Sequence, residues 1–353
     1  MELTSISLPL LSVIFVLAAA AIWFAGIKLS KTTDILSSKF GFGEALGGAI
    51  VLAIVTNLPE IAITVSAALK NDLSIAIGNI LGGIALQTVV LVVLDAFGLG
   101  KKGNLTYLAA SIPLILEALS VIAVLSLVIM GHELPTSFIL FHVEPVCVLI
   151  VVCWIISLWL INKAGKGLPW QESGHGTKSL FKDDGPAKKK KENKAKAVST
   201  TKVIALFIFC ALITLLAGVA LEESGSAIAK DIHMGGLIFG ATVLALATSL
   251  PEISTGLASI KLGDYKMAMS DIFGGNAFLP VLFLIASLIS GKSPLPQAQK
   301  SDIYLTCLAM LLTIIYICGM IFRPKKQFWN MGIDSILVLL IYLLGVGGLF
   351  VIG

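Results

Sequence analysis

The sequence predicts an all-α polytopic membrane protein whose ten transmembrane helices form two inverted five-helix repeats. Composition is the first reason: the 353 residues are 57% hydrophobic and 13% charged, with a mean hydropathy of +0.98. Soluble domains are typically about a quarter charged. The second reason is a series of ten apolar runs, and the third is a stretch of the first half that recurs in the second.

The ten apolar runs are bounded by charged or turn residues and are each long enough to cross a bilayer, which takes about 20 residues. The first should be a retained span, since no basic residue precedes Lys28 and a signal peptide would carry one. The second and seventh exceed what a bilayer needs and contain proline, so we expect them to be kinked or broken. The expected helices are 7–27, 43–70, 73–97, 105–130, 137–161, 201–221, 234–261, 265–290, 302–322 and 331–352.

These helices divide the chain into a first five-helix repeat (1–161), a lysine-rich linker (162–200) and a second five-helix repeat (201–353). The linker has few apolar residues and cannot bury a core, so we expect it to be a disordered, solvated tether. Contact between its lysines and anionic lipid headgroups is the alternative.

Basic residues orient the chain, because cytoplasmic loops are enriched in Lys and Arg. With the linker in the cytoplasm, alternation of ten spans places 21 of the 25 basic residues inside and 4 outside. Both termini then face outward, in the plasma membrane or inner membrane of the cell. The net charge of +4 therefore indicates orientation in a bilayer, and no nucleic-acid partner is expected.

An internal repeat aligns residues 48–85 with 240–277 at an offset of 192 residues, with 16 identities in 38 positions. Each half carries five helices, an odd number, so the two copies enter the membrane from opposite sides. Inverted repeats of this kind build the central sites of many secondary transporters.

The repeat centres on Thr56 to Glu60 in the first half and on Thr248 to Glu252 in the second. In each copy a threonine precedes a glutamate by four residues and shares its helical face. Proline has no N–H to donate, so a backbone carbonyl one turn earlier is also freed. The freed carbonyls are those of Val55 (by Pro59) and Ala247 (by Pro251).

Carboxylate, hydroxyl and carbonyl oxygens are the ligands of hard cations such as Ca²⁺, Mg²⁺ and Na⁺. A charged side chain at mid-membrane costs at least ~2.5 kcal/mol, and two facing glutamates repel unless a cation or proton lies between them. Glu60 and Glu252 therefore predict a cation site. A structural role with hydrogen-bonded neighbours is the alternative.

The helix after each motif should form the other wall of the site, with Glu60 level with Gly83 and Glu252 level with Gly275. Residues four apart on the facing surface are Asn79, Gly83 and Gln87 in one copy, and Asp271, Gly275 and Leu279 in the other. The paired glycines either pack helices closely or take a direct ligand role. Asp271 either lies on the ion path or caps or pairs with a neighbour.

Other polar residues are less informative. Glu117 near the middle of the fourth run is either a proton relay or an internally hydrogen-bonded group, and His142 and Glu144 should be interfacial. The five cysteines lie singly in apolar runs and are expected to be small hydrophobes. The sequence contains no HExxH, GxSxG or phosphate-loop pattern, so no enzyme activity and no cofactor are expected.

At these motifs the sequence resembles the calcium/cation antiporter superfamily, the sodium/calcium exchangers and their relatives. The family carries a TSLPE-type motif in the second helix of each repeat and a GNxxGSN-type motif in the third. Here the second motif covers Gly78 to Ile84 and Ser270 to Asn276. The resemblance implies a ten-helix fold and export of Ca²⁺ against Na⁺ or H⁺, with the two glutamates as central ligands.

The sequence departs from the family pattern at several positions. The ion-binding serine of the family is Gly83 in one copy and Gly275 in the other, and the first-motif serine is Asn57 in one copy. Where sodium-coupled members carry Asn or Asp, this chain has Gln87 and Leu279. The implied sodium ligands are thus depleted while the glutamate pair remains.

The leading hypothesis is a secondary cation antiporter that exchanges Ca²⁺ for Na⁺ by alternating access. H⁺ coupling, a cation channel and a non-transporting membrane scaffold are the alternatives. The partners are these ions and the lipid bilayer, and the oligomeric state is not determined by the sequence. The predicted ligand set is Glu60, Glu252, Thr56, Thr248, Asn57, Ser249, Asp271, Asn79, Gln87, Val55 and Ala247.

Overall fold

The computed structural model describes residues 7–40, 51–135, 143–168, 199–232 and 245–352, and these are almost entirely helical. The elements of the first half are α1 (Leu8–Phe40), α3 (Ala53–Thr56), α4 (Leu58–Leu69), α5 (Leu73–Gly98), η3 (Gly100–Lys102), α6 (Leu105–Ala109), α7 (Ile112–Glu133) and α8 (Pro145–Lys166). Those of the second half are α10 (Thr200–Asp231), α12 (Ala245–Thr248), α13 (Leu250–Lys261), α14 (Tyr265–Phe278), η6 (Leu279–Val281), α15 (Leu282–Ser290), η7 (Leu295–Gln297), α16 (Lys300–Phe322), the two-stranded β1 (Gln327–Phe328) and β2 (Met331–Gly332), and α17 (Ile333–Ile352).

Seven described helical segments are long and apolar enough to cross a membrane, which confirms an all-α integral membrane protein. Two further apolar helices are shorter, Leu58–Leu69 and Ile333–Leu349. Residues 41–50 and 233–244, on which the second and seventh expected spans partly fall, lie outside the described residues, as does linker segment 169–198. The seven long segments are Leu8–Thr33, Leu73–Gly98, Ile112–Glu133, Pro145–Lys166, Thr200–Asp231, Tyr265–Ser290 and Lys300–Phe322.

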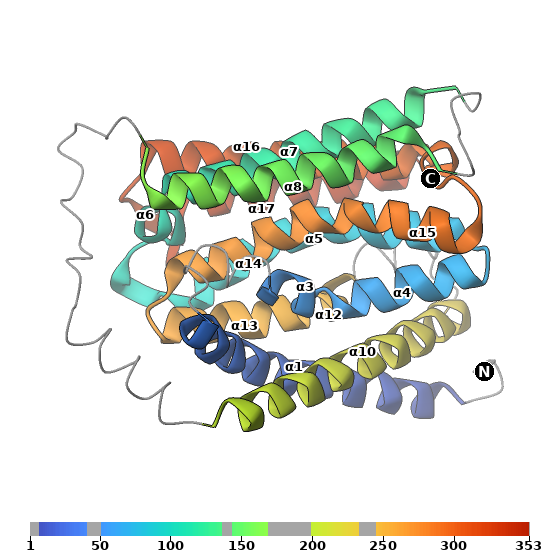
Figure 1. Ribbon diagram of the computed structural model, residues 1–353, viewed down its shortest axis with the longest axis horizontal. Helices are drawn as coiled ribbons and strands as arrows, with labels where there is room; N and C mark the ends of the chain where they lie inside the picture. Colours follow the sequence, from blue (N-terminus) through green and yellow to red (C-terminus); the bar gives the residue numbers. More distant parts are fainter. Residues whose placement is uncertain (1–6, 41–50, 136–142, 169–198, 233–244, 353) are drawn as a thin grey trace.

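The helices stack in layers (Figure 1). α7, α8, α16 and α17 form one face, and the long pair α1 and α10 forms the opposite face. Between them lie α5 with α14 and α15, and then the short pairs α3–α4 and α12–α13. The two glutamate motifs therefore lie on inner elements, covered on both sides.

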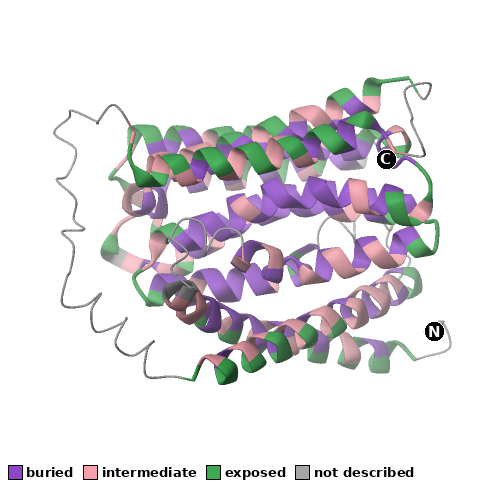
Figure 2. Cartoon of the chain, in the orientation of Figure 1, coloured by how far each residue is buried: buried purple, intermediate pink, exposed green. Residues whose placement is uncertain are grey.

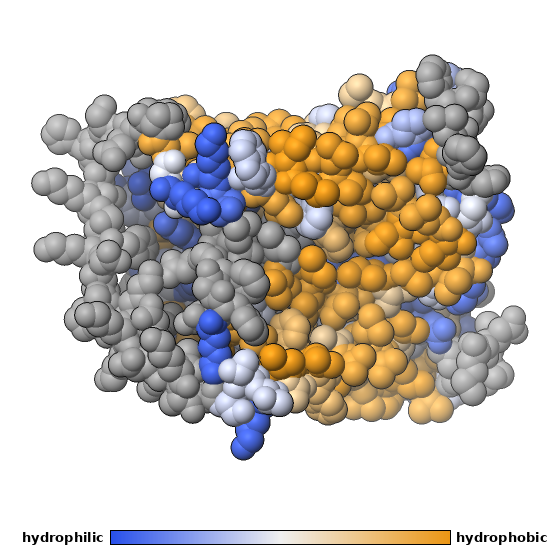
Figure 3. Space-filling model, in the orientation of Figure 1, coloured by the Kyte–Doolittle hydropathy of each residue, from blue (hydrophilic) through white to orange (hydrophobic). Residues whose placement is uncertain are grey.

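The start of α1 and the end of α17 lie at one end of the molecule, and the end of α8 and the start of α10 lie at the other (Figure 1). An apolar band covers the middle of the visible face, and hydrophilic residues gather toward its two ends (Figure 3). Exposed apolar side chains suit a lipid environment, and the inner layers are the buried ones (Figure 2). The end of α8 and the start of α10 are thus at the opposite end of the apolar band from the start of α1 and the end of α17.

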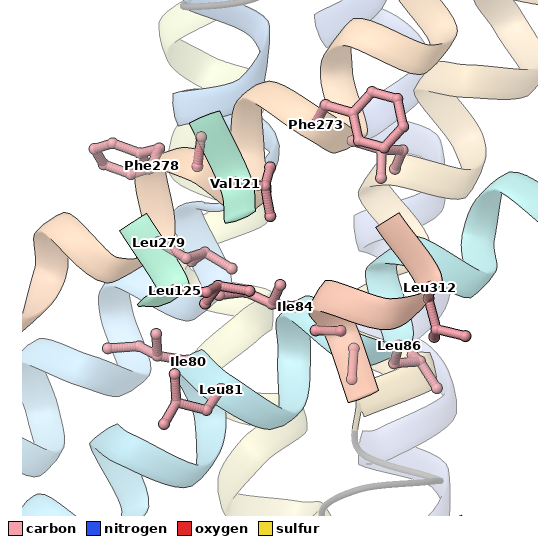
Figure 4. Close-up of a cluster of buried hydrophobic side chains, with 14 of the residues drawn as sticks. Ile80, Leu81, Ile84, Leu86, Val121, Leu125, Phe273, Phe278, Leu279 and Leu312 are labelled. Carbon is pink, nitrogen blue, oxygen red and sulfur yellow. The ribbon is translucent and has the colours of Figure 1, made fainter. Parts of the chain in front are cut away.

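The main core joins the two halves. Ile80 and Ile84 of α5 pack with Leu125 of α7 and with Phe278 and Leu279 of the second half (Figure 4). All five side chains are buried. This contact fixes α5 against α14, the two helices that form the far wall of the site.

The expected ends of the first and sixth helices are wrong. We expected them near 27 and 221, but α1 continues to Phe40 and α10 to Asp231. The polar extension of α1 stays helical because it packs on α13: Leu29 and Thr33 are buried, and the Ser30 and Ser259 hydroxyls are 3.5 Å apart. Lys39 therefore lies in the last turn of α1, and its Nζ donates to the Thr200 hydroxyl at the start of α10 (3.0 Å).

Proline divides two other expected helices. The fourth was expected over 105–130, but α6 ends at Ala109 and α7 begins at Ile112, with extended backbone at Ser111 and Pro113 in the first turn. The eighth was expected over 265–290 and is interrupted by the 3₁₀ turn η6, which contains Pro280. The fifth begins at Pro145 instead of 137, and residues 136–142 lie outside the described residues.

Each half packs a glycine of its first helix against the motif proline of the other half. A Cβ on Gly218 of α10 would lie 2.8 Å from the Pro59 Cα, and a Cβ on Gly26 of α1 would lie 3.3 Å from the Pro251 Cα and overlap the Ser254 hydroxyl. Gly26 and Gly218, like Pro59 and Pro251, are separated by the repeat offset of 192 residues. Small residues allow such close backbone approach between membrane helices.

We expect Gly218→Ala to lower the thermal unfolding temperature of the purified protein. The added methyl group overlaps the backbone of Pro59, and over-packing of this kind typically costs ~1–3 kcal/mol. Gly347→Ala is the matched control, because a Cβ there has no atom within 4 Å. The control should be neutral or slightly stabilising, as alanine favours helix by up to ~1 kcal/mol over glycine. Equal effects of the two variants would contradict the close contact.

Candidate functional site

The two motif helices are broken at equivalent residues, as expected from their prolines. α3 ends at Thr56 and α4 starts at Leu58, with Asn57 between them at φ −83° and ψ 15°. In the second half Ser249 separates α12 from α13 at φ −81° and ψ 4°. Pro59 and Pro251 occupy the first turns of the new helices, where the missing N–H is not needed. Each break brings a helix C-terminus and a helix N-terminus together inside the protein.

The two glutamates lie in the first turns of α4 and α13 and are buried, with 1% of Glu60 and 0% of Glu252 exposed. The positive end of a helix dipole stabilises a carboxylate in this position. From the central region α4 and α13 run toward opposite ends of the molecule (Figure 1). Two helix N-termini therefore each hold one anionic side chain in the interior.

The Gln87 amide of α5 joins the two glutamates. Its Nε2 lies 3.2 Å from Glu60 Oε1 and 3.5 Å from Glu252 Oε1, and it also donates to Asn57 Oδ1 at 2.9 Å. A single amide group within reach of both carboxylates places the two glutamates close together. The predicted pairing of Glu60 and Glu252 is therefore present, with Gln87 beside both.

Three buried oxygens around this amide have no hydrogen-bond partner among the described residues: Oε2 of Glu60, Oε2 of Glu252 and Oε1 of Gln87. Buried polar atoms are normally satisfied. One turn before Gln87 on α5, a Cβ on buried Gly83 would have no described atom within 4 Å. Buried carboxylate and amide oxygens without a described partner fit a hard cation, which takes oxygen ligands.

Asp271 is buried, and both of its carboxylate oxygens accept hydrogen bonds from hydroxyl groups. Its Oδ1 accepts from the Thr56 hydroxyl at 3.0 Å and its Oδ2 from the Thr255 hydroxyl at 2.5 Å. It also lies near enough to Glu252 for the two charges to repel. Within the described part of the chain, no three acidic, histidine or cysteine side chains converge to hold a metal ion. Asp271 therefore adds negative charge beside Glu252. Of the two roles expected for it, a place on the ion path or pairing with a neighbour, the structure favours pairing.

Thr56 was expected to share a face with Glu60, and the break in the helix changes this. Its hydroxyl also lies within hydrogen-bonding distance of the carbonyls of Leu52 and Ala53, besides the contact to Asp271. The chain turns at Asn57, so the regular four-residue spacing no longer holds. The first-half threonine thus contacts a carboxylate of the second half.

The remaining predicted ligands surround the two breaks. The hydroxyls of Thr248 and Ser249 donate to the carbonyl of Ala245 (3.1 and 2.8 Å), which leaves their lone pairs available. The Asn79 amide donates to the backbone carbonyl of Glu60 at 3.3 Å. Together with Gln87, this contact confirms that Glu60 is level with Gly83.

The two carbonyls freed by proline, those of Val55 and Ala247, were expected to lack a hydrogen bond, but that of Val55 accepts one. A backbone N–H at the end of α3 bonds the carbonyl of Val55, because the chain tightens at the break. Val55 keeps one lone pair at most for an ion. Ala247 is buried in the last turn of α12, directly before the second break.

Two residues at the site were missing from the predicted set. Thr255 binds Asp271 across two helices, a contact that depends on how α13 and α14 pack and leaves no mark in local sequence. Asn276 is buried, donates to the Thr88 hydroxyl at 3.1 Å and keeps an unpartnered Oδ1. Asn276 could have been found from its place in the second motif, directly after Gly275. A Cβ on Gly275 would lie 2.5 Å from Asn57 Nδ2.

The other acids considered from the sequence are separate from this centre. Glu117 lies in the second turn of α7, is 2% exposed, and interacts with Ser270. Glu144 precedes α8 and is 5% exposed, so it is more buried than an interfacial group. Burial raises the pKa of Glu144 to about 7. His142 lies outside the described residues.

Comparison with known proteins identifies the family. The sequence profile described as sodium/calcium exchanger protein matches residues 10–163 and again residues 202–348. The chain belongs to the sodium/calcium exchanger family. The resemblance at the glutamate motifs is therefore confirmed for most of the chain, and the protein is a member of a transporter family rather than of an enzyme family.

Relatives of this exchanger-family chain include the inner membrane protein YrbG of Escherichia coli, 24% identical over 86% of each chain. The putative antiporter CaxA of Alkalimonas amylolytica is 25% identical over 76% of this chain and 77% of its own. The human sodium/potassium/calcium exchanger 1 is 29% identical over 30% of this chain and 10% of its own. The solved structure of the sodium-calcium exchanger NCX_Mj shares the fold, with a TM-score of 0.65, 19% identity, and coverage of 97% of this chain and 100% of that one.

We expect Thr255→Val to lower the free energy of unfolding by ~1–3 kcal/mol, because Asp271 Oδ2 would lose its donor while staying buried. Unfolding in mixed micelles measures this change. Thr255→Ser is the matched control and should stay close to the parent, since it keeps the hydroxyl. A valine variant as stable as the serine variant would show that this hydrogen bond does not stabilise the protein.

Proposed function

We propose that this chain is a secondary active cation antiporter that exports Ca²⁺ in exchange for Na⁺ by alternating access. The proposal includes ten transmembrane helices in two inverted repeats and a location in the plasma membrane or inner membrane of the cell. Both termini would face outward and the lysine-rich linker the cytoplasm. The ligand centre would be Glu60 and Glu252 with their neutral oxygen neighbours.

One observation carries the proposal: two buried glutamates from equivalent positions of the two halves share a single amide donor. Gln87 Nε2 lies 3.2 and 3.5 Å from their Oε1 atoms, and each glutamate keeps its Oε2 unpartnered. Two carboxylates this close repel without a positive charge. A divalent cation neutralises both, and the Gln87 amide can turn its unpartnered Oε1 toward the ion.

The packing of the outer helix pair supports alternating access. α1 and α10 contact the motif prolines through Gly26 and Gly218 and contact each other along their lengths. A glycine at each of these contacts lets α1 and α10 approach the motif helices closely, and in the proposed cycle this pair moves relative to the inner helices. The names of the relatives agree, since one is a putative antiporter and another a sodium/potassium/calcium exchanger.

H⁺ coupling is the second candidate, and the second half of the site favours it. Gly275 has no side-chain oxygen and its Cβ position is filled by Asn57, while Leu279 is fully buried and apolar. These are the positions where the family pattern carries sodium ligands. Carboxylates can carry protons in the absence of such ligands, so the coupling ion is the main quantity to test.

We expect purified protein in liposomes to accumulate ⁴⁵Ca²⁺ against its gradient when an outward Na⁺ gradient is imposed. A channel cannot move Ca²⁺ beyond its electrochemical equilibrium, so uptake above that equilibrium with the membrane potential clamped at zero separates the two classes of protein. A pH gradient without Na⁺ is the second arm. Uptake driven only by the pH gradient would replace Na⁺ with H⁺, and uptake in neither arm would contradict Ca²⁺ antiport.

Glu60→Gln and Glu252→Gln provide the site controls for this assay. Each removes one charge without changing shape, and each should abolish exchange while the protein remains folded. Glu133→Gln is the matched control, because that carboxylate is 76% exposed and far from the motifs in sequence. Full exchange in either site variant would contradict the assignment of the centre.

We expect Gly83→Ser to strengthen Na⁺ binding, because the new hydroxyl enters space with no atom within 4 Å. The Na⁺ concentration for half-maximal exchange should fall roughly fivefold, equivalent to ~1 kcal/mol. Gly275→Ser is the comparison variant and should impair exchange, since its side chain would meet Asn57 Nδ2 at 2.5 Å. An unchanged Na⁺ dependence in Gly83→Ser would show that the space beside Gly83 does not receive Na⁺.

A further inference from the structure

A second buried polar cluster lies where α5, α16 and α17 meet, outside the glutamate centre. Asp334 in the first turn of α17 is 4% exposed, and both of its carboxylate oxygens are buried with no hydrogen-bond partner in the part of the chain that the structure describes. Asn104, before α6, is fully buried and its Oδ1 is also unpartnered. Three unpartnered oxygens of buried side chains in one region require an explanation.

Glycines make room for these groups. A Cβ on Gly319 of α16 would overlap the Asp334 carboxylate, and a Cβ on Gly332 would overlap both Asp334 and Asn104. The Asp334 carboxylate and the Asn104 side chain, through its Nδ2 and Cβ, therefore both lie against Gly332. The Asn104 amide is oriented by its Nδ2, which donates to the carbonyl of Pro324 at 2.7 Å, so its oxygen is the free end.

A second carboxylate stands beside this group. Asp95 of α5 is 1% exposed and accepts the backbone N–H groups of Leu105 and Gly332, each at 2.7 Å. Asp334 is close enough to Asp95 for their charges to repel. The Ser335 hydroxyl, 3.4 Å from the Tyr316 hydroxyl, lies in the same cluster.

No described cation neutralises Asp334. Of the basic residues that precede it, Arg323 and Lys325 both lie over the Tyr107 ring, and Arg323 Nη2 donates to the Tyr107 carbonyl at 2.9 Å. A buried carboxylate without a partner is strongly unfavourable, and a neighbouring carboxylate adds repulsion. The carboxylate pair, the Asn104 amide oxygen and a hydroxyl are ligands typical of a hard divalent cation.

We infer that Asp334, Asp95 and Asn104 form an accessory divalent-cation site, of which Ca²⁺ is the expected occupant. The site is separate from the glutamate centre, because Asp95 lies eight residues beyond Gln87 on α5, roughly 12 Å along the helix. A bound ion there would tie the end of α5 and the turn before α6 to the start of α17. The inference does not depend on the transported ion or on the coupling ion.

Equilibrium binding of ⁴⁵Ca²⁺ to full-length protein in detergent tests the site, with Glu60→Gln/Glu252→Gln as the background that removes the central carboxylates. We expect this double variant to keep one saturable site and to unfold at higher temperature in Ca²⁺. Adding Asp334→Asn should weaken that binding at least about tenfold, since the affinity of oxygen sites depends on the number of charged ligands. Adding Glu133→Gln instead, at an exposed carboxylate, should change nothing.

Two results would overturn the inference: no Ca²⁺ binding by the double variant, or unchanged binding after Asp334→Asn. Stabilisation of the double variant by Na⁺ but not by Ca²⁺ would also overturn the divalent assignment. Asn replaces Asp without a change in shape, and the unfolding temperature in chelator shows whether the triple variant remains folded. Gly332→Ala is the second variant, because its methyl group overlaps both ligands while every charge is kept, and it should weaken binding as well. If the glutamate centre does not bind Ca²⁺, wild type and the double variant will instead bind the same amount of ⁴⁵Ca²⁺.

Discussion

The contact of one amide with two buried carboxylates is the interaction on which the arrangement of the centre depends. A single unpaired carboxylate at mid-membrane costs at least ~2.5 kcal/mol, and a second one nearby adds repulsion. The structure offsets this cost locally: each glutamate lies at a helix N-terminus, and Gln87 reaches both. The broken helices are needed for this, because a continuous helix has no free N-terminus in the membrane interior.

Neither half of the chain completes the site alone. The Thr56 hydroxyl of the first half binds Asp271 of the second, and Asn57 fills the space beside Gly275. The outer helices cross over in the same way, with Gly218 on Pro59 and Gly26 on Pro251. Because each outer helix contacts the motif of the other half, a movement of α1 and α10 relative to the inner helices would act on both halves together.

The sequence predicts the class of the fold, the two broken helices and the glutamate pair, because composition, proline and charge act locally. It fails where tertiary packing decides. The hydrophobic run ends near residue 27, but α1 continues to Phe40 because its polar residues are buried against α13. The Thr255–Asp271 hydrogen bond depends on how two helices are placed side by side. The position of Asp334 beside Asp95 has the same origin, since the residues are far apart in the chain.

The two halves of the site have become chemically unequal, and the difference bears on coupling. The first half contributes the amides of Asn57, Asn79 and Gln87, while at the positions of the last two the second half has Asp271 and Leu279. Glu252 consequently lies near two other carboxylates, Glu60 and Asp271. One neutral amide cannot balance three acids in a buried centre, so positive charge has to enter with the substrate or as protons. In the proposed antiport, a divalent cation between the glutamates would supply this charge, and its departure would leave a deficit for the exchanged ion to fill. On that proposal, the charge of the site itself favours exchange over simple release.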